Sequence, residues 1–114
     1  MIVVLTTVPD LEEAERLARL IVEEKLGACV QILPRMTSIY FWEGKVQSES
    51  EHLLLIKTVD EKFDALSEFI RSNHSYEVPE IVAISAERVS KDYLSWMQEY
   101  IGTEIAQQVR EADE

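Results

Sequence analysis

Residues 37–59 read TSIYFWEGKVQSESEHLLLIKTV, and this stretch decides the fold. Its first part, Thr37 to Trp42, has high β propensity, and Glu43-Gly44-Lys45 is typical of a hairpin turn. The chain then returns as a second strand from Val46 to Val59, which is most apolar at Leu53 to Ile56. The sequence therefore predicts a long β-hairpin at its centre.

A strand, a helix and a further strand are expected before the turn. Met1 to Val8 is apolar at nearly every position, which predicts a central strand buried on both faces. A helix should run from an Asp10 cap to about Leu26, with Gly27 as its C-cap glycine. Cys29 to Trp42 is strand-like, and we expect a bulge or bend at Pro34 because proline removes a ladder donor.

The second half repeats this order. Asp60 is expected to cap a second helix ending near His74, Glu80 to Val89 predicts a fourth strand, and a short third helix should end at Ile101. This order predicts an α+β, ferredoxin-like split βαβ sandwich with an extended β-hairpin and a C-terminal helix. We expect one domain over residues 1–102, with an acidic tail at 103–114 that joins the domain or is flexible.

The helices of such a fold cover one face of the sheet, yet several predicted strands are apolar on both faces. Exposed apolar patches larger than a few hundred Å² are rare on monomers. The third helix is too short to cover the second face, so self-association is expected.

Composition narrows the function classes. The chain has 114 residues, 46% of them hydrophobic, and a formal net charge of −11, so nucleic acid and anionic membrane are poor partners. The sequence contains no long apolar run, and its single cysteine, Cys29, cannot form an internal disulfide. We therefore expect a cytoplasmic location.

Three groups of short sequence motifs resemble those of the CutA divalent-cation tolerance family. They are Val3 to Pro9, Ala28-Cys29-Val30 with Thr37 to Lys45 and Leu53 to Thr58, and His74 to Ile81 with Tyr93 to Trp96. The match covers residues 1 to about 101. It implies a homotrimer with inter-subunit clefts and a link to tolerance of metal ions such as copper.

The resemblance also implies metal ligands, and here the chain departs from the family. Thr6 stands where some members have a copper-associated cysteine, and Asn73-His74-Ser75 replaces a His-His-Pro word. Only His74 remains as a metal candidate, and copper binding is expected to be weak and not essential, because such metals prefer several thiolate or imidazole ligands. The alternative role for His74 is a cap on the helix-end carbonyls.

Five other residues are candidates for an inter-subunit cleft: Cys29, Trp42, Lys57, Tyr76 and Glu80. Lys57 follows four apolar strand residues, so it should pair with a carboxylate such as Glu80 or await an anionic ligand. Cys29 is either a small buried hydrophobe or a thiol at the cleft rim. Trp42 belongs to an aromatic run that favours interface packing.

A non-enzymatic binding protein is the favoured function. Acylphosphatases share the fold, but Thr6 to Asp10 lacks the glycine and arginine of their phosphate loop. No P-loop, serine triad or metalloprotease word appears either. The alternative is a PII-like signalling trimer that binds a nucleotide or small anion between subunits.

Overall fold

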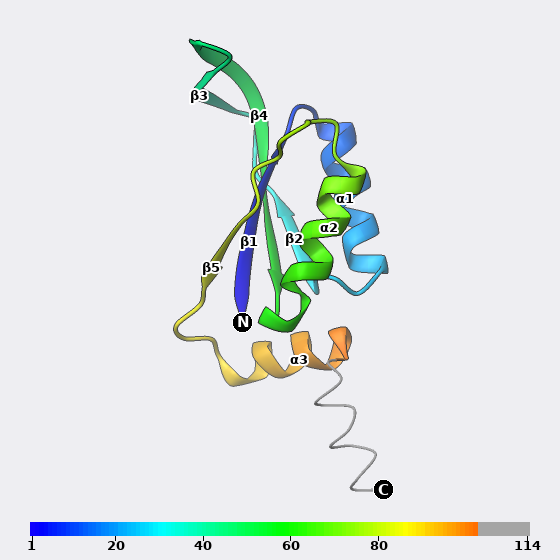
Figure 1. Ribbon diagram of the computed structural model, residues 1–114. Helices are drawn as coiled ribbons and strands as arrows, with labels where there is room; N and C mark the ends of the chain where they lie inside the picture. Colours follow the sequence, from blue (N-terminus) through cyan, green and yellow to red (C-terminus); the bar gives the residue numbers. More distant parts are fainter. Residues whose placement is uncertain (103–114) are drawn as a thin grey trace, which may run out of the picture.

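The computed structural model describes residues 1–102 and shows an antiparallel sheet with two helices on one face (Figure 1). The predicted tail, residues 103–114, lies outside the described residues. In chain order the elements are β1 (Ile2–Val8), α1 (Leu11–Glu23), β2 (Cys29–Ile32), β3 (Met36–Trp42), β4 (Lys45–Thr58), the 3-10 turn η1 (Asp60–Lys62), α2 (Phe63–Asn73), β5 (Val82–Ser85) and α3 (Lys91–Ile101).

The strand order β2-β4-β1-β5 confirms the predicted ferredoxin-like α+β fold. Strand β4 is the longest, and its two halves have different partners. Its inner half pairs with β1 and β2, whereas its outer half, Lys45 to Glu51, pairs only with β3. The hairpin therefore projects beyond the part of the sheet that the helices cover (Figure 1).

The predicted break at Pro34 is confirmed, because β2 ends at Ile32 and β3 starts at Met36. Two hydrogen bonds hold the junction. The Leu33 N–H donates to the carbonyl of Leu53, and Nδ1 of the buried His52 ring donates to the carbonyl of Leu33 at 2.9 Å. The hairpin thus leaves the sheet at a fixed point.

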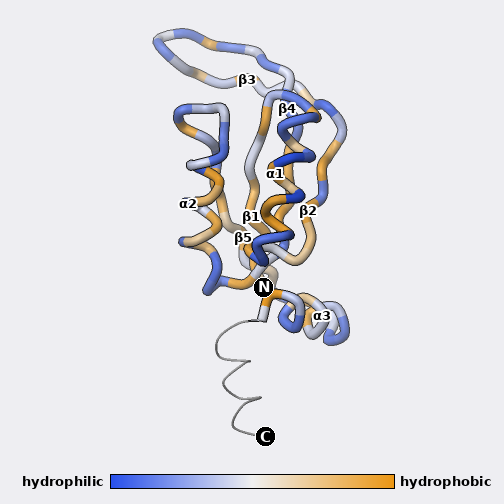
Figure 2. The backbone as a smooth tube through the Cα atoms, turned by 90° about the vertical axis from the view of Figure 1, so that its right-hand side faces the viewer, coloured by the Kyte–Doolittle hydropathy of each residue, from blue (hydrophilic) through white to orange (hydrophobic). Residues whose placement is uncertain are grey.

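The core lies between the sheet and the helices α1 and α2. Alternate residues of β1 and β4 point to the helices and are fully buried, among them Val4 and Leu54. The buried residues of both helices belong to the same core cluster, and Figure 2 shows hydrophobic residues recurring along α1 and α2. Helix α3 packs at the end of the sheet through Met97 and Ile101, beside Val59. Together these contacts bury one face of the sheet and one of its ends.

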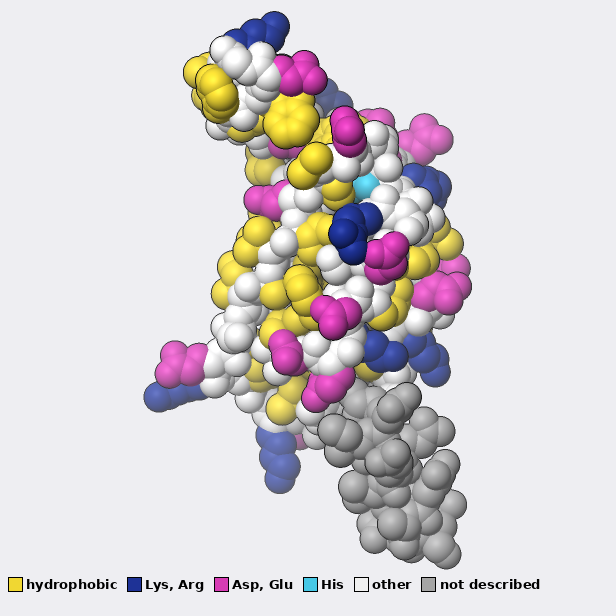
Figure 3. Space-filling view, viewed as in Figure 1, with side chains coloured by type: hydrophobic (Ala, Val, Ile, Leu, Met, Phe, Trp, Pro, Cys, Tyr) yellow, Lys and Arg dark blue, Asp and Glu magenta, His cyan; other side chains and the backbone are white. Residues whose placement is uncertain are grey.

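The other face of the sheet is open. Val3, Leu5, Leu53 and Leu55 are only partly buried there. On β5, Val82 and Ile84 are 45% and 53% exposed, and apolar side chains gather on this side of the molecule (Figure 3). Further exposed apolar positions are on the projecting hairpin, where Ile39, Phe41 and Val46 are each more than 70% exposed.

Three local predictions are wrong. Helix α1 ends at Glu23, and Lys25, at φ 58°, takes the left-handed conformation expected of Gly27. Position 27 needs a glycine for another reason, because a Cβ there would lie 2.9 Å from Cγ2 of Ile56. Strand β5 is shorter than predicted because its pairing with β1 ends at Ile2. Asp60 starts the 3-10 turn and does not cap α2 with its side chain.

Candidate functional site

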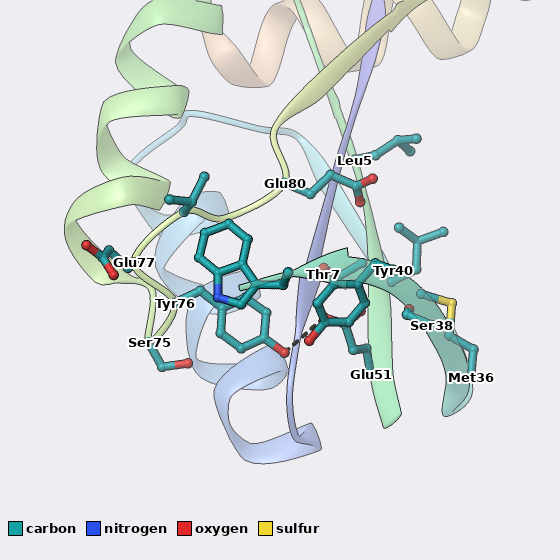
Figure 4. Close-up of a pocket in the computed structure, with 13 residues that line it drawn as sticks. Leu5, Thr7, Met36, Ser38, Tyr40, Glu51, Ser75, Tyr76, Glu77 and Glu80 are labelled. Carbon is teal, nitrogen blue, oxygen red and sulfur yellow. Dashed lines mark hydrogen bonds between the residues drawn. The ribbon is translucent and has the colours of Figure 1, made fainter. Parts of the chain in front are cut away.

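A pocket of about 690 Å³ lies beside the point where the hairpin leaves the sheet (Figure 4). Three separate parts of the chain form it: β1, the hairpin strands β3 and β4, and the connection from α2 to β5. The lining residues are Leu5, Thr7, Met36, Ser38, Tyr40, Trp42, Glu51, Leu53, Ser75, Tyr76, Glu77, Val78 and Glu80.

Strand register explains which side chains reach the pocket. Side chains alternate between the two faces of a strand, so Leu5 and Thr7 point away from the helices that Thr6 faces. Thr7 pairs with Leu53 on β4. Glu51 lies two residues before Leu53, so its side chain is on the same face of the strand. The open face of the sheet thus forms the floor of the pocket.

A buried carboxylate is the main polar feature of the site. Glu51 is only 7% exposed, and its Oε2 accepts a 2.9 Å hydrogen bond from the Tyr76 hydroxyl. Desolvation, then the hydrogen bond and the charge of Glu51, raise the pKa of Tyr76 well above its ordinary value of 10.0. Tyr76 therefore remains a hydrogen-bond donor to Glu51 at neutral pH.

Acidic and aromatic side chains dominate the rest of the lining. Tyr40, Tyr76 and Glu51 lie close together in Figure 4, Glu80 lies near Leu5, and the Glu77 carboxylate points away. Desolvation and the nearby charges of Glu49 and Glu51 raise the pKa of Tyr40. None of the described residues that line the pocket is basic.

His74 positions the connection that carries Tyr76. Its side chain is fully buried, and Nε2 donates to the carbonyl of Thr7 at 2.7 Å. Nδ1 accepts from the Tyr76 N–H at 2.9 Å and lies 3.6 Å from the Glu13 carboxylate. His74 is the C-cap residue of α2, but the carbonyl that its ring bonds is at the end of β1, so the side chain does not satisfy the helix-end carbonyls. Both ring nitrogens are already in use, and a metal would have to break one of these bonds.

The structure brings together three of the five predicted cleft residues, Trp42, Tyr76 and Glu80. The other two, Cys29 and Lys57, are cross-strand neighbours on the same open face but do not line the pocket. In the described part of the chain no ion pair joins Lys57 to Glu80. The Lys57 ammonium lies instead 5.4 Å from the centre of the Tyr93 ring.

Glu51 is the residue that sequence reasoning missed. It lies in the polar run Gln47 to His52, which gives no sign of burial. Alternate residues of a strand share one face, so the position of Glu51 on the same face as Leu53 and Leu55 was the sequence pattern that could have indicated its burial. What buries the carboxylate is Tyr76, which is distant in sequence.

The two positions where the resemblance implied metal ligands, Thr6 and Asn73, have other surroundings here. The Thr6 hydroxyl is fully buried in the core without a hydrogen-bond partner. The Asn73 amide donates to the carbonyl of Phe69 at the end of α2. Among residues 1–102 no group of three His, Cys, Asp or Glu side chains could hold a metal ion. His74 as a metal ligand thus remains a prediction.

Solved structures share this fold. The chain has a TM-score of 0.86 and 40% identity to the structure of the periplasmic divalent cation tolerance protein CutA from Archaeoglobus fulgidus, covering 89% of this chain and 99% of that one. For divalent cation tolerance protein (Cut A1) from Thermus thermophilus the TM-score is 0.85 and the identity 46%, over 88% and 98% of the two chains. Both similarities extend over nearly the whole of each relative.

Curated relatives differ in length and in location. The divalent-cation tolerance protein CutA of Thermus thermophilus is 47% identical over 100 residues, which are 88% of this chain and 97% of the relative. Protein CutA 1, chloroplastic, from Oryza sativa is 48% identical over 97 residues, 85% of this chain. The chain spans about half the length of that relative, 55%.

These names overturn the predicted cytoplasmic location. One relative is named chloroplastic and one solved structure periplasmic, so membership of this family does not indicate a cytoplasmic location. A second finding bears on membranes. Within residues 1–102, no helix is long and apolar enough to cross a bilayer.

A family model described as CutA1 divalent ion tolerance protein matches residues 2–100. The match includes every strand of the sheet, the hairpin and nearly all of α3. Two relatives that are 47% and 45% identical over 100 and 96 aligned residues are named divalent-cation tolerance protein CutA. The chain belongs to the CutA1 divalent ion tolerance protein family.

Proposed function

We propose that this protein is a homotrimer that acts in tolerance of divalent cations such as copper and binds its ligands in clefts between subunits, without catalysing a reaction. Membership of the family supports the cation-tolerance role. The trimer and its clefts come from the sequence resemblance, and the open face of the sheet is the observation that supports them.

That open face carries the proposal because its apolar side chains have no cover within residues 1–102. Val82 and Ile84 on β5 adjoin the partly buried Val3 and Leu5 of β1. Burying such a surface in water is favourable by roughly 25 cal/mol per Å² of apolar area. A second and a third copy of the chain would cover this face, which helix α3 does not reach.

A charge placed on the open face tests this proposal. Ile84→Asp should lower the mass of the protein in solution, measured by light scattering, because an interface would bury the new carboxylate. Arg19→Asp, on the exposed side of α1, is the control and should leave the mass unchanged. Equal masses for the two variants and the unmodified chain would exclude this face as the interface.

Copper binding is proposed to be weak. His74 has both nitrogens hydrogen-bonded, and residues 1–102 of one chain hold no cluster of ligands for a metal. Calorimetric titration with Cu(II) should therefore show no stoichiometric site tighter than about micromolar. A tight site that disappears in His74→Ala would contradict this expectation.

The alternative is a PII-like signalling trimer that binds a nucleotide or another anion. The pocket opposes this alternative, because Glu51, Glu77 and Glu80 line it and no basic residue among those described does. An anion at this place would meet like charges in a partly desolvated site, which is unfavourable. The non-enzymatic role rests on the family's description, which speaks of tolerance of divalent ions and names no reaction.

A further inference from the structure

The pocket combines two features that recognise the same kind of ligand. Its aromatic side chains are Tyr40, Trp42 and Tyr76, and its acidic side chains are Glu51, Glu77 and Glu80. The face of an aromatic ring attracts cations through its quadrupole, most strongly for tryptophan, and several rings together recognise alkylated ammonium groups. Carboxylates at the same place add a Coulomb attraction of the same sign.

Burial makes Glu51 the centre of this arrangement. The side chain is 7% exposed and has one hydrogen bond from a neutral hydroxyl, that of Tyr76. No cationic side chain of the described residues forms an ion pair with it. A buried carboxylate without a cationic partner is costly, so a cation entering the pocket would lower that cost.

The dimensions of the site distinguish an organic cation from a metal ion. The cavity of about 690 Å³ falls within the usual range for small-molecule sites. Although Glu51, Glu77 and Glu80 all line it, no three acidic side chains of residues 1–102 are grouped closely enough to hold a metal. A metal needs several oxygens within about 2.6 Å, whereas a bulky ammonium needs a wide, partly apolar cavity.

We propose that this pocket binds a small organic cation with an alkylated ammonium group. The ammonium lies among the rings of Tyr40, Trp42 and Tyr76, and Glu51 and Glu80 balance its charge. Met36, Leu53 and Val78 contact the apolar part of the ligand. Selectivity over neutral molecules comes from the positive charge, and selectivity over inorganic cations comes from the aromatic walls.

This inference deepens the proposed function by naming a ligand class. It rests on that function in one respect: the pocket must lie in one of the clefts left between subunits, while neighbouring copies cover the rest of the open sheet face. Binding and mass are measured on the same sample to separate the two ideas. Binding by a monomer would support the inference and contradict the trimer. A trimer that binds no organic cation would support the assembly and overturn the inference, as expected if a neighbouring copy fills the pocket.

Choline and 3,3-dimethylbutan-1-ol are the probes, because they differ chiefly in having a charged nitrogen or a neutral carbon at the branched centre. Calorimetric titration of the full chain should show one saturable choline site per chain. The neutral analogue should bind at least about tenfold more weakly, since it loses both the ring and the carboxylate interactions. Equal affinities, or no choline binding, would overturn the proposal.

Two variants and a matched control assign the site. Glu51→Gln and Glu80→Gln should each weaken choline binding about tenfold and leave the neutral analogue unaffected. Glu15→Gln, on the exposed side of α1, removes the same charge far from the pocket and should bind choline normally. Thermal unfolding without ligand reports whether each variant folds. Unchanged choline binding in folded Glu51→Gln and Glu80→Gln would overturn the assignment.

Discussion

The Tyr76 hydroxyl donates a 2.9 Å hydrogen bond to Oε2 of Glu51, joining the connection that follows α2 to the middle of the long strand β4. The two residues are 25 positions apart, and neither could be assigned this role from its own neighbours in sequence. The bond closes the pocket wall and satisfies one oxygen of a buried carboxylate. It therefore links the stability of the protein to the geometry of the candidate site.

Removing the donor should destabilise the fold. Tyr76→Phe keeps the ring but deprives Glu51 of its hydrogen bond, which should lower the free energy of unfolding by about 1–2 kcal/mol. Chemical denaturation measures the change. Tyr93→Phe is the control, because its hydroxyl forms no hydrogen bond in the described structure, and it should change stability by less than about 0.5 kcal/mol. Equal effects of the two variants would contradict the role given to Tyr76.

The same tyrosine predicts a loss of stability in alkali. Its pKa is raised in the folded state, so unfolded Tyr76 ionises near 10.0 while folded Tyr76 keeps its proton. Its contribution is therefore fully present below pH 10 and is lost as the pH rises further. Between pH 9 and 11, denaturation curves should show a smaller loss of unfolding free energy for Tyr76→Phe than for the unmodified chain. An equal loss of unfolding free energy in both proteins would show that Tyr76 does not contribute to the loss of stability in alkali.

The core holds an unpaired hydroxyl whose removal should be favourable. Thr6 is fully buried and its hydroxyl has no partner. Thr6→Val keeps the shape and removes the desolvation cost, so stability should rise by about 1 kcal/mol. Thr6→Ser is the matched control, because it keeps the hydroxyl, loses a methyl group and should be destabilising. A loss of stability in Thr6→Val would reveal an unrecognised hydrogen bond.

Replacing Lys57 tests whether its ammonium belongs to a structural ion pair or is an unpaired cation. It has no ion pair with Glu80, and its ammonium lies over the Tyr93 ring. Lys57→Met should therefore change the free energy of unfolding by less than about 1 kcal/mol, the size of an exposed cation–π contact. Breaking a buried ion pair would cost about 3–5 kcal/mol. A loss of that size, restored by also replacing Glu80, would revive the pairing that the sequence suggested.

The sequence predicted the elements whose signal is local. The apolar run Leu53 to Ile56, the turn at Glu43-Gly44 and the interruption at Pro34 were sufficient to predict the hairpin and its bend. Gly27 was misassigned because a glycine after a helix usually caps it. Here the neighbouring strand requires the glycine, through the close approach of Ile56, and that contact cannot be read locally.

The candidate site was only partly predictable for the same reason. Trp42, Tyr76 and Glu80 stood out as aromatic or charged residues in unusual places, and they do share the pocket. Glu51 did not, because its burial depends on Tyr76, which is distant in sequence. The resemblance implied that Lys57 lies near an inter-subunit cleft; within one chain it lies outside this pocket, further along β4, and its place in such a cleft stays a prediction.

The mass of the unmodified protein in solution tests the central claim most directly, because the open sheet face is explained by self-association. Size-exclusion chromatography with light scattering should give about three times the chain mass of 13.1 kDa, unchanged on dilution to micromolar concentration. A stable species of one chain mass at that concentration would contradict the trimer and leave the apolar face of the sheet without an explanation.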